Sequence, residues 1–263
     1  GSDKYTRGVV GVATGSATYP GAAVLSGAGA SAGPTGMVRY AGGAADQVRA
    51  HHPPVIVTER VAEAGRVQAW VCGSGLGTNE HARTELRTVL AQPVPVCLDA
   101  DAITMLVDGS MADLLRGRGA PIVLTPHDRE FARLAGEPPG PDRVESALRL
   151  AAKVGATVLL KGDRTVIGTP AGRAWVNPTG TPVLATGGTG DVLAGLLGSL
   201  LAAGSATAPA GPGAEEAASR AAVAAAYLHG LAGREAARHG PVTASDAAAA
   251  LRPVIASLLA APE

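Results

Sequence analysis

Short, wholly apolar runs alternate with segments of helical pattern along most of the chain. Runs of this kind, rich in β-branched residues, lie at 9–13, 55–57, 69–72, 94–98, 121–124 and 157–160. A strand with no polar face is typical of a parallel sheet that is covered on both sides. The helical patterns lie at 79–91, 142–154, 191–203, 214–238 and 244–260. This alternation predicts an α/β fold, a three-layer α/β/α sandwich with a mostly parallel central sheet.

Two further runs, 165–168 and 173–176, are separated by Thr169-Pro170-Ala171-Gly172, which is a turn composition. They predict an antiparallel hairpin that extends one edge of the sheet. Since no internal repeat or linker separates two cores, we expect a single domain over residues 3–262. Gly1-Ser2 resembles a cloning remnant.

Composition excludes several classes of function. Lys and Arg number 22, as do Asp and Glu, and aromatic residues make up only 3% of the chain, so we expect no nucleic-acid partner. The uncharged stretch between Asp191 and Glu215 is long enough to cross a bilayer, but 204–213 has a loop composition, so we expect no membrane span. Cys72 and Cys97 lie in apolar runs and are expected to be buried free thiols. Without a signal-peptide pattern, these features predict a cytoplasmic protein.

The most informative segment is the glycine loop Thr186-Gly187-Gly188-Thr189-Gly190-Asp191. Apolar pairs recur every four residues after Asp191, so the loop is expected to end at a helix N-terminus. The unpaired N–H groups there form an anion site that glycines open to phosphate oxygens. Asp191 either caps the helix or takes a proton from a substrate hydroxyl that attacks a phosphoryl group.

Two other nucleotide motifs fit less well. No Gly-Lys-Ser/Thr follows the glycines at 187–190, so the loop is not a Walker A motif. Gly73-Ser74-Gly75-Leu76-Gly77 follows an apolar run and precedes Asp99 in the manner of a dinucleotide-binding unit, but its spacing is G-x-G-x-G. A nicotinamide compound bound there is therefore expected to be a substrate and not a redox cofactor.

Several segments together resemble one family. Besides Thr186–Gly195, these segments are Lys4–Gly8, Tyr19–Leu25, Gly73–Gly77, Leu98–Ala102, Leu124–His127, Leu160–Gly162 and Tyr227–Gly230. Taken in their order along the chain, these segments resemble the ADP- or ATP-dependent NAD(P)HX dehydratases of the ribokinase-like superfamily. The resemblance implies a hydro-lyase that repairs NADHX and NADPHX. It would be an ADP-dependent (6S)-NAD(P)HX dehydratase that phosphorylates the ring hydroxyl with ADP, or alternatively ATP, as donor. Phosphate would then leave to give NAD(P)H, with AMP as the other product of ADP.

The resemblance also implies roles for single residues. Asp191 would be the catalytic base, and the amides of Gly188, Thr189 and Gly190 would form the anion hole. The hydrated nucleotide would contact Ala22, Gly75, His127 and Asp191. The AMP portion of the donor would contact Lys161, Gly162, Asp163, Arg164, Thr165 and Gly190. Mg²⁺ is expected with the donor, but no metal ligand is assigned.

Some features stay open. Many members of the family have Pro at Ser74 and Pro-Gly at Asp128-Arg129, and many carry an additional N-terminal epimerase domain. A thiazole or hydroxymethylpyrimidine kinase of the same superfamily, or a nucleotide-binding module without catalysis, would also need the loop at 188–191. The Ala-rich helices near the C-terminus favour a homo-oligomer.

Other polar residues have two interpretations each. Asp99 and Asp101 are expected to cap a helix in preference to binding Mg²⁺ through water. Glu130 is either part of a metal or phosphate network or a first-turn charge. Lys161 pairs with a nucleotide phosphate or is exposed, and His229 is expected to be a hydrogen-bond partner in the core.

Overall fold

A computed structural model describes residues 6–207, 211 and 213–260. Its centre is a nine-stranded sheet with the order β3-β2-β1-β4-β5-β6-β7-β8-β9, parallel from β3 to β7 and antiparallel from β7 to β9. The strands are β1 Val9–Ala13, β2 Met37–Ala41, β3 Ile56–Thr58, β4 Ala69–Cys72, β5 Val96–Leu98, β6 Ile122–Leu124, β7 Thr157–Leu160, β8 Val166–Gly168 and β9 Ala174–Val176. The carboxyl ends of all the parallel strands therefore meet at one edge.

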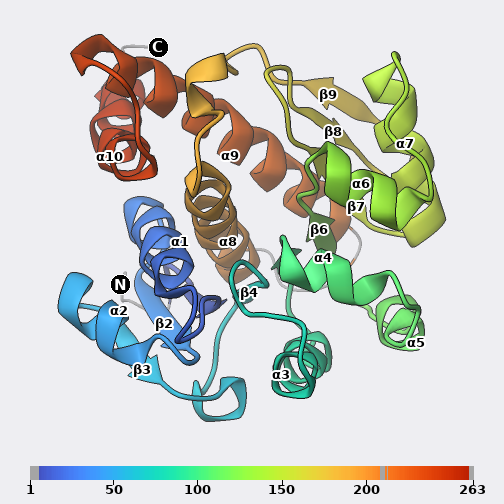
Figure 1. The fold of residues 1–263 in the computed structure, drawn as a ribbon, viewed down its shortest axis with the longest axis horizontal. Helices are drawn as coiled ribbons and strands as arrows, with labels where there is room; N and C mark the ends of the chain where they lie inside the picture. The colour runs from blue at the N-terminus through green and yellow to red at the C-terminus, as the bar shows by residue number, and fades with distance from the viewer. Residues whose placement is uncertain (1–5, 208–210, 212, 261–263) are drawn as a thin grey trace.

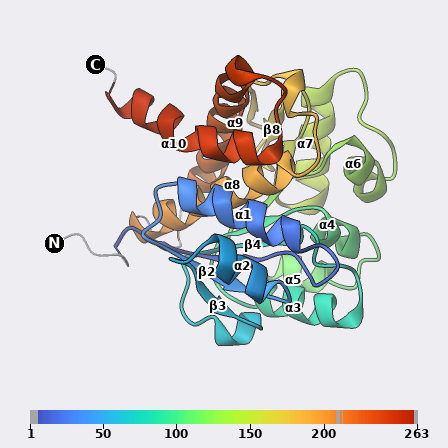
Figure 2. The same ribbon diagram turned by 60° about the vertical axis from the view of Figure 1, so that its left-hand side comes forward.

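Helices cover both faces of the sheet (Figures 1 and 2). One apolar core lies between the sheet and α1 Pro20–Ala32, α2 Ala45–His51, α8 Thr189–Thr207, α9 Ala214–Ala236 and α10 Ala244–Ala260. The opposite face packs against α3 Glu80–Leu90, α4 Asp101–Leu106, α5 Ala112–Arg116, α6 Asp128–Ala135 and α7 Arg143–Val154. The predicted three-layer α/β/α architecture is confirmed.

The predicted hairpin at the sheet edge is also confirmed, since β8 pairs antiparallel with both β7 and β9. Cys72 and Cys97 are buried free thiols in β4 and β5, as expected. The outer bounds of the predicted domain, 3 and 262, and Gly1-Ser2 lie outside the described residues, as do Lys4 and Tyr5 of the family-like opening.

Helix α8 is the central helix of the first core. Gly195 lets it approach α1 so closely that a Cβ there would lie 2.0 Å from the carbonyl oxygen of Ser26. Helix α8 is long and apolar enough to cross a membrane, but 61% of its most apolar 18-residue stretch is buried inside the fold. Its uncharged sequence is therefore explained by packing between α1, α9 and the sheet.

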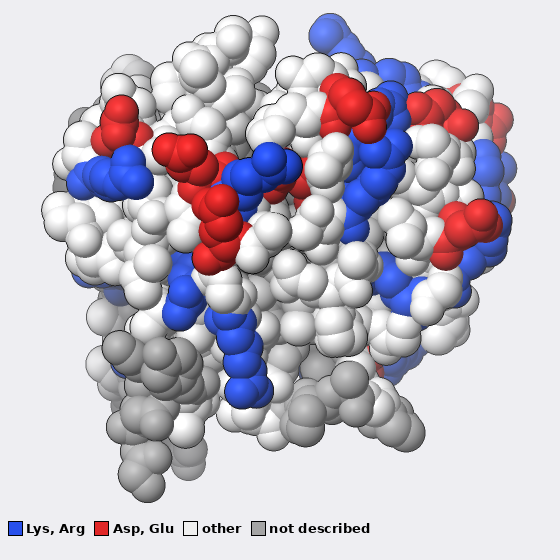
Figure 3. All heavy atoms as spheres, turned by 90° about the horizontal axis from the view of Figure 1, so that it is seen from below, with Lys and Arg blue, Asp and Glu red and all other residues white. Residues whose placement is uncertain are grey.

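Charged side chains on the face shown in Figure 3 are mixed in sign, with Lys and Arg beside Asp and Glu. Ion pairs join residues that are distant in the sequence: Arg83 of α3 lies 2.8 Å from Asp108, and Arg143 of α7 lies 2.9 Å from Asp128 of α6. Exposed pairs of this kind contribute at most about 1 kcal/mol each. The stability of the fold therefore comes mainly from its apolar cores.

Candidate active site

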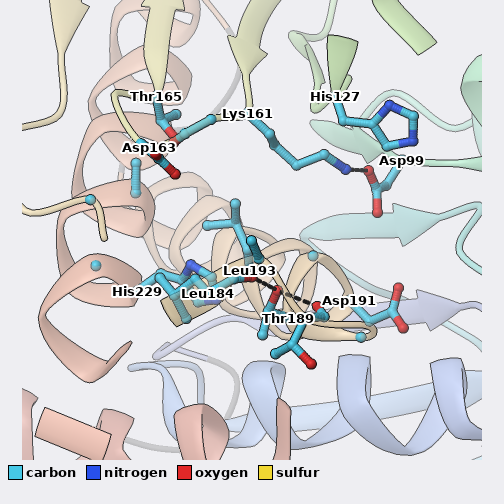
Figure 4. Close-up of a pocket in the computed structure, with 18 of the residues that line it drawn as sticks. Asp99, His127, Lys161, Asp163, Thr165, Leu184, Thr189, Asp191, Leu193 and His229 are labelled. Carbon is cyan, nitrogen blue, oxygen red and sulfur yellow. Dashed lines mark hydrogen bonds and ion pairs between the residues drawn. The ribbon is translucent and has the colours of Figure 1, made fainter. Parts of the chain in front are cut away.

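A cavity of about 970 Å³ opens at the edge where the parallel strands end (Figure 4). Its walls come from the loops after β5, β6 and β7, the start of α8, and α9. Two parts of it differ in chemistry. We call Asp99, Glu130, Lys161 and Asp191 the carboxylate end, and Leu184, Ala226, His229 and Gly230 the apolar end.

The glycine loop lies between these ends and leads directly into α8. Thr189 fixes the loop, because its hydroxyl donates to the carbonyls of Leu184 at 2.7 Å and Thr186 at 3.0 Å. Gly188 has φ +89°, and a Cβ on it would lie 2.4 Å from Leu25 Cδ1. Because the first N–H groups of a helix have no intrahelical acceptor, Thr189 and Gly190 present an anion site to the cavity.

Asp191 follows in the first turn of α8. Burial and the negative charge of Asp99 raise the pKa of its carboxyl to about 6, against the lowering effect of a hydrogen bond with Ser74 and of the Lys161 ammonium. A carboxyl with this pKa is mostly ionised at neutral pH and has a greater proton affinity than an exposed aspartate. Asp191 is therefore suited to accept a proton beside the anion site.

Asp99 is a buried acceptor at the end of β5. Its Oδ1 accepts from Thr125 Oγ1 and from Lys161 Nζ, both at 2.7 Å, and its Oδ2 accepts from Ser74 Oγ at 3.0 Å. The expectation that Asp99 and Asp101 cap a helix is wrong. The N-cap of α4 is Ala100, which makes no side-chain capping bond, and Asp101 Oδ2 instead accepts from the N–H of Gly77 at 2.8 Å.

Lys161 follows β7 and extends toward Asp99 (Figure 4). Its Nζ lies 2.7 Å from Asp99 Oδ1 and 3.6 Å from Glu130 Oε2, and its side chain is 18% exposed. Of the two sequence interpretations, simple exposure is wrong. Burial lowers the pKa of Lys161, but the carboxylates of Asp99, Glu130 and Asp191 outweigh that effect, so the pKa is raised and the ammonium remains charged.

His127 and Glu130 form a capping box at the start of α6. Nδ1 of His127 accepts from the N–H groups of Arg129 and Glu130, and Glu130 Oε2 accepts from the N–H of His127 at 2.8 Å. The ring therefore carries its proton on Nε2, which lies 3.4 Å from Glu130 Oε1. His127 lines the cavity at the rim, where it can contact a ligand.

The stretch predicted to hold AMP lies in the β7–β8 loop. Gly162, Asp163 and Thr165 line the cavity, whereas Arg164 is exposed and does not line it. A Cβ on Gly180 would lie 2.0 Å from the carbonyl oxygen of Asp163, so the loop is packed closely against the segment after β9. Figure 4 shows the Lys161 side chain extending toward Asp99 and away from Asp163 and Thr165.

Ala22 and Gly75, predicted to contact the hydrated nucleotide, lie next to each other outside the lining of this cavity. A Cβ on Gly75 would be 2.8 Å from the Cβ of Ala22, and Gly75 has φ +63°. Gly75 follows Ser74, whose hydroxyl donates to Asp99 Oδ2 at 3.0 Å, and the charge of Asp99 raises the pKa of Asp191. The cavity thus brings together His127, Asp191 and most of the predicted AMP contacts, whereas Ala22 and Gly75 lie outside its lining.

His229 is buried at the apolar end, on α9. Burial lowers the pKa of its ring to about 4, against the opposing effect of a backbone hydrogen bond with Thr189. Its Nε2 is one of the buried side-chain atoms in the described part of the chain that have no hydrogen-bond partner. His229 was expected to be a hydrogen-bond partner in the core. That expectation holds for the bond with the Thr189 backbone, whereas Nε2 has no partner.

The described residues contain no group of three His, Cys, Asp or Glu side chains able to hold a metal ion. The oxygens of Asp99 are occupied by donors, and Glu130 already accepts from the His127 N–H. Mg²⁺ commonly binds through one or two carboxylates together with substrate phosphates and water. The donor set therefore fits an ion carried by a nucleotide and does not form a protein cage.

A family model described as NAD(P)H-hydrate dehydratase matches residues 10–253. The chain belongs to this family. The expected family is thereby confirmed. The ribokinase-like fold is confirmed by the crystal structure of a ribokinase-like superfamily protein from Enterococcus faecalis, which has a TM-score of 0.82 at 29% identity and covers 97% of this chain and 89% of that one. The chain is 57% identical over 202 residues to the bifunctional NAD(P)H-hydrate repair enzyme Nnr of Mycobacterium tuberculosis, covering 77% of this chain and 42% of that enzyme. It thus spans about two fifths of the length of this relative.

This chain covers a larger share of two other relatives. An ADP-dependent (S)-NAD(P)H-hydrate dehydratase of Neisseria meningitidis is 39% identical over 215 residues, which are 77% of this chain and 72% of that one. The crystal structure of an ADP/ATP-dependent NAD(P)H-hydrate dehydratase from Bacillus subtilis, co-crystallized with ATP/Mg²⁺, has a TM-score of 0.81 at 29% identity, covering 97% and 91% of the two chains.

Three functional candidates were not predicted from the sequence: the hydroxyls of Ser74 and Thr125, and the acceptor role of Asp99. Both hydroxyls are buried and donate to Asp99, which itself raises the pKa of Asp191. Each follows a strand, and carboxyl ends of parallel strands converge. That convergence was the available signal, but it does not specify which side chains bond to one another.

Proposed function

We propose that this chain is an ADP-dependent (6S)-NAD(P)HX dehydratase that restores NADH and NADPH from their hydrated forms. The observation that carries the proposal is the position of Asp191, a carboxyl with a pKa of about 6 beside the anion site at the start of α8. Family membership gives the reaction class, and the glycine loop supplies the N–H groups that phosphoryl transfer requires.

The proposed reaction has two steps. Asp191 accepts the proton of the ring hydroxyl while that oxygen forms a bond to the terminal phosphorus of ADP, and the phosphorus–oxygen bond to AMP breaks. The N–H groups at Gly188–Gly190 stabilise the charge on the transferring group. Phosphate then leaves with the electrons of its bond to the ring carbon, and loss of a ring proton restores the double bond. NADHX and ADP become NADH, AMP, phosphate and a proton.

The cavity supports separate places for the two substrates. The donor would extend from the apolar end, past Gly162, Asp163 and Thr165, to the glycine loop. The hydrated nucleotide would approach Asp191 from the side of Ala22, Gly75 and His127. Mg²⁺ supplies charge neutralisation on the donor phosphates when bound. ADP is favoured over ATP by the name of the Neisseria relative, whereas the Bacillus relative is named for both.

The direct test is to incubate the chain with NADHX and ADP and to follow the return of nicotinamide absorbance. We expect AMP, phosphate and recovered NADH to appear in equal amounts, and chelation of Mg²⁺ to stop the reaction. Recovery of NADH without nucleotide cleavage would contradict the phosphorylation step. Parallel assays with NADPHX and with ATP measure the two preferences.

A small-molecule kinase is the alternative. A hydroxyethylthiazole kinase from Pyrococcus horikoshii shares the fold, with a TM-score of 0.63 at 19% identity. The same assay separates the two functions, because a kinase leaves a phosphorylated product whereas a dehydratase releases free phosphate. A nucleotide-binding module without catalysis would bind AMP but would turn over neither substrate.

We also propose that the protein is cytoplasmic and forms a homo-oligomer. Buried free thiols at Cys72 and Cys97 support a reducing compartment. The exposed Leu258 and Leu259 near the end of α10 support a subunit contact. The molar mass in solution, measured by light scattering, tests the oligomer. A monomer at micromolar concentration would contradict it.

A further inference from the structure

Lys161 has a position that its place in the sequence does not explain. It begins the β7–β8 loop, where the predicted AMP contacts Gly162, Asp163 and Thr165 line the cavity. Its side chain nevertheless extends away from Asp163 and Thr165 toward Asp99 (Figure 4). A Cβ on Gly190 would lie 3.5 Å from Lys161 Nζ. The ammonium is therefore at the anion site and not beside the neighbouring loop residues.

The hydrogen bonds of this ammonium are incomplete. A lysine ammonium has three N–H donors. One is bonded to Asp99 Oδ1 at 2.7 Å, and Glu130 Oε2 at 3.6 Å is an ion-pair partner beyond normal hydrogen-bond distance. At 18% exposure the side chain has little access to water. The remaining donors are thus available to an acceptor placed between Lys161 and the glycine loop.

Charge at this end of the cavity calls for such a group. Among the described residues that line the cavity, two are lysine or arginine: Arg129 and Lys161. Arg129 is exposed at the rim. The carboxylates of Asp99, Glu130 and Asp191 surround Lys161 and repel an incoming phosphoryl oxygen. Lys161 is therefore the buried side chain able to offset that repulsion.

We propose that Lys161 is a catalytic residue, whose ammonium binds the transferring phosphoryl group opposite the N–H groups of Gly188–Gly190. This inference rests on the proposed function and assigns Lys161 to the group being transferred, in place of the AMP portion. Asp99 is the positioning residue, because its short bond holds the ammonium over the anion site. The attacking oxygen approaches from the Asp191 side.

The test separates the terminal phosphoryl group from the rest of the nucleotide. Dissociation constants for ADP and for AMP are measured by calorimetry in the wild type and in Lys161→Met, with Lys153→Met as the control. Lys153 is exposed on α7 and donates to the carbonyl of Ala135, outside the cavity. We expect Lys161→Met to weaken ADP binding about tenfold or more and to leave AMP binding within about twofold, as one lost charge-assisted bond implies.

Turnover gives the second readout. With saturating ADP, kcat of Lys161→Met is expected to fall about 10²–10³-fold, the usual effect of removing one electrostatic stabiliser of the transition state. Equal loss of AMP and ADP affinity, or an unchanged kcat, would overturn the proposal. If the wild type returns no NADH from NADHX, the proposed function fails, while the ratio of ADP to AMP affinity still tests Lys161.

A second variant separates the loss of ligand binding from the loss of stability. Lys161→Met leaves two buried carboxylates without their cation, which destabilises a fold. The effect of Lys161→Met is therefore also measured in an Asp99→Asn protein, in which one of those charges is removed but an amide oxygen can still accept from the Lys161 ammonium. The selective loss of ADP affinity is expected in both backgrounds. Its absence in Asp99→Asn, with folding verified by circular dichroism, would contradict direct contact between Lys161 and the phosphoryl group.

Discussion

The two ends of the cavity differ in the charge state of their buried ionisable groups. At the carboxylate end, Asp99 and Glu130 pair with Lys161, and burial together with the charge of Asp99 raises the pKa of Asp191 to about 6. At the apolar end, His229 is held neutral by a pKa of about 4 among Leu184, Ala226 and Gly230. The comparison teaches that one end is built to change its charge during a reaction and the other to avoid charge.

The largest expected effect comes from Asp191→Asn. The amide cannot accept the hydroxyl proton, so kcat should fall about 10²–10⁴-fold while AMP still binds. The free energy of unfolding at pH 7 should rise, because burial and Asp99 raise the pKa of Asp191 and make its ionised form unfavourable in the fold. The gain is on the order of 2 kcal/mol. Steady-state kinetics and urea denaturation measure the two effects.

The pH dependence of the wild type provides a control for the first prediction. The carboxylate form of Asp191 is the base, so kcat/KM should decrease as the pH falls below about 6, its pKa in the fold. If Asp191→Asn retained wild-type turnover, Asp191 would be only a residue of the first helical turn. A variant that loses activity without gaining stability would contradict the raised pKa.

The fold was largely predictable because its strands carry an apolar pattern that any parallel sheet requires. The missed strand β2, Met37–Ala41, contains Arg39, whose guanidinium leaves the strand and donates to the carbonyl of Ala64 at 2.6 Å. Among the helices that the pattern missed is α1, whose sequence is rich in Gly, Ala and Ser and has no apolar periodicity. Its position depends on close contact with α8 at Gly195, which pattern reasoning cannot detect.

The site was predictable only where one segment carries it. The glycine loop and Asp191 are contiguous, so their chemistry could be inferred from the sequence. The partners of Asp99 could not, since Ser74 and Lys161 are 25 and 62 residues away from it. The helix-cap interpretation of Asp99 followed from local pattern and failed because a tertiary ion pair replaced the local bond.

The second prediction compares two glycines of the loop between the ends. Gly188→Ala should reduce kcat by at least tenfold and destabilise the fold by roughly 1–3 kcal/mol, because Gly188 has φ +89° and its Cβ would meet Leu25 at 2.4 Å. Gly190→Ala should leave stability within about 0.5 kcal/mol, a normal surface effect. Its Cβ would make an ordinary 3.5 Å contact with Lys161 Nζ. Thermal denaturation and kinetics of the two variants measure the contrast, and equal destabilisation would contradict it.

The third prediction tests the apolar end alone. A Cβ on Gly230 would lie 2.3 Å from Thr179 Oγ1, whose hydroxyl bonds to the carbonyl of Tyr227 at 2.8 Å and holds the loop against α9. Gly230→Ala should destabilise the fold by roughly 1–3 kcal/mol through overpacking. Because the carboxylate end is not touched, AMP affinity should fall more than kcat at saturating donor. A fall in kcat with unchanged AMP affinity would show that the two ends are not independent.

The smallest expected effect is in the pH dependence of stability, where the two ends oppose each other. Between about pH 4 and 6 folded Asp191 binds a proton that the unfolded chain has lost, so its contribution to stability falls as pH rises. His229 behaves in the opposite sense, because its pKa falls from 6.5 in the unfolded chain to about 4 in the fold, and stability lost at low pH returns as pH rises. Each slope reaches at most about 1.4 kcal/mol per pH unit, and the two largely cancel.

Of these two slopes, only that of His229 remains in Asp191→Asn. The difference in unfolding free energy between this variant and the wild type should therefore grow from near zero at pH 4 to its full value above pH 6. Urea denaturation across that range measures it, and a difference independent of pH would show that Asp191 does not titrate there.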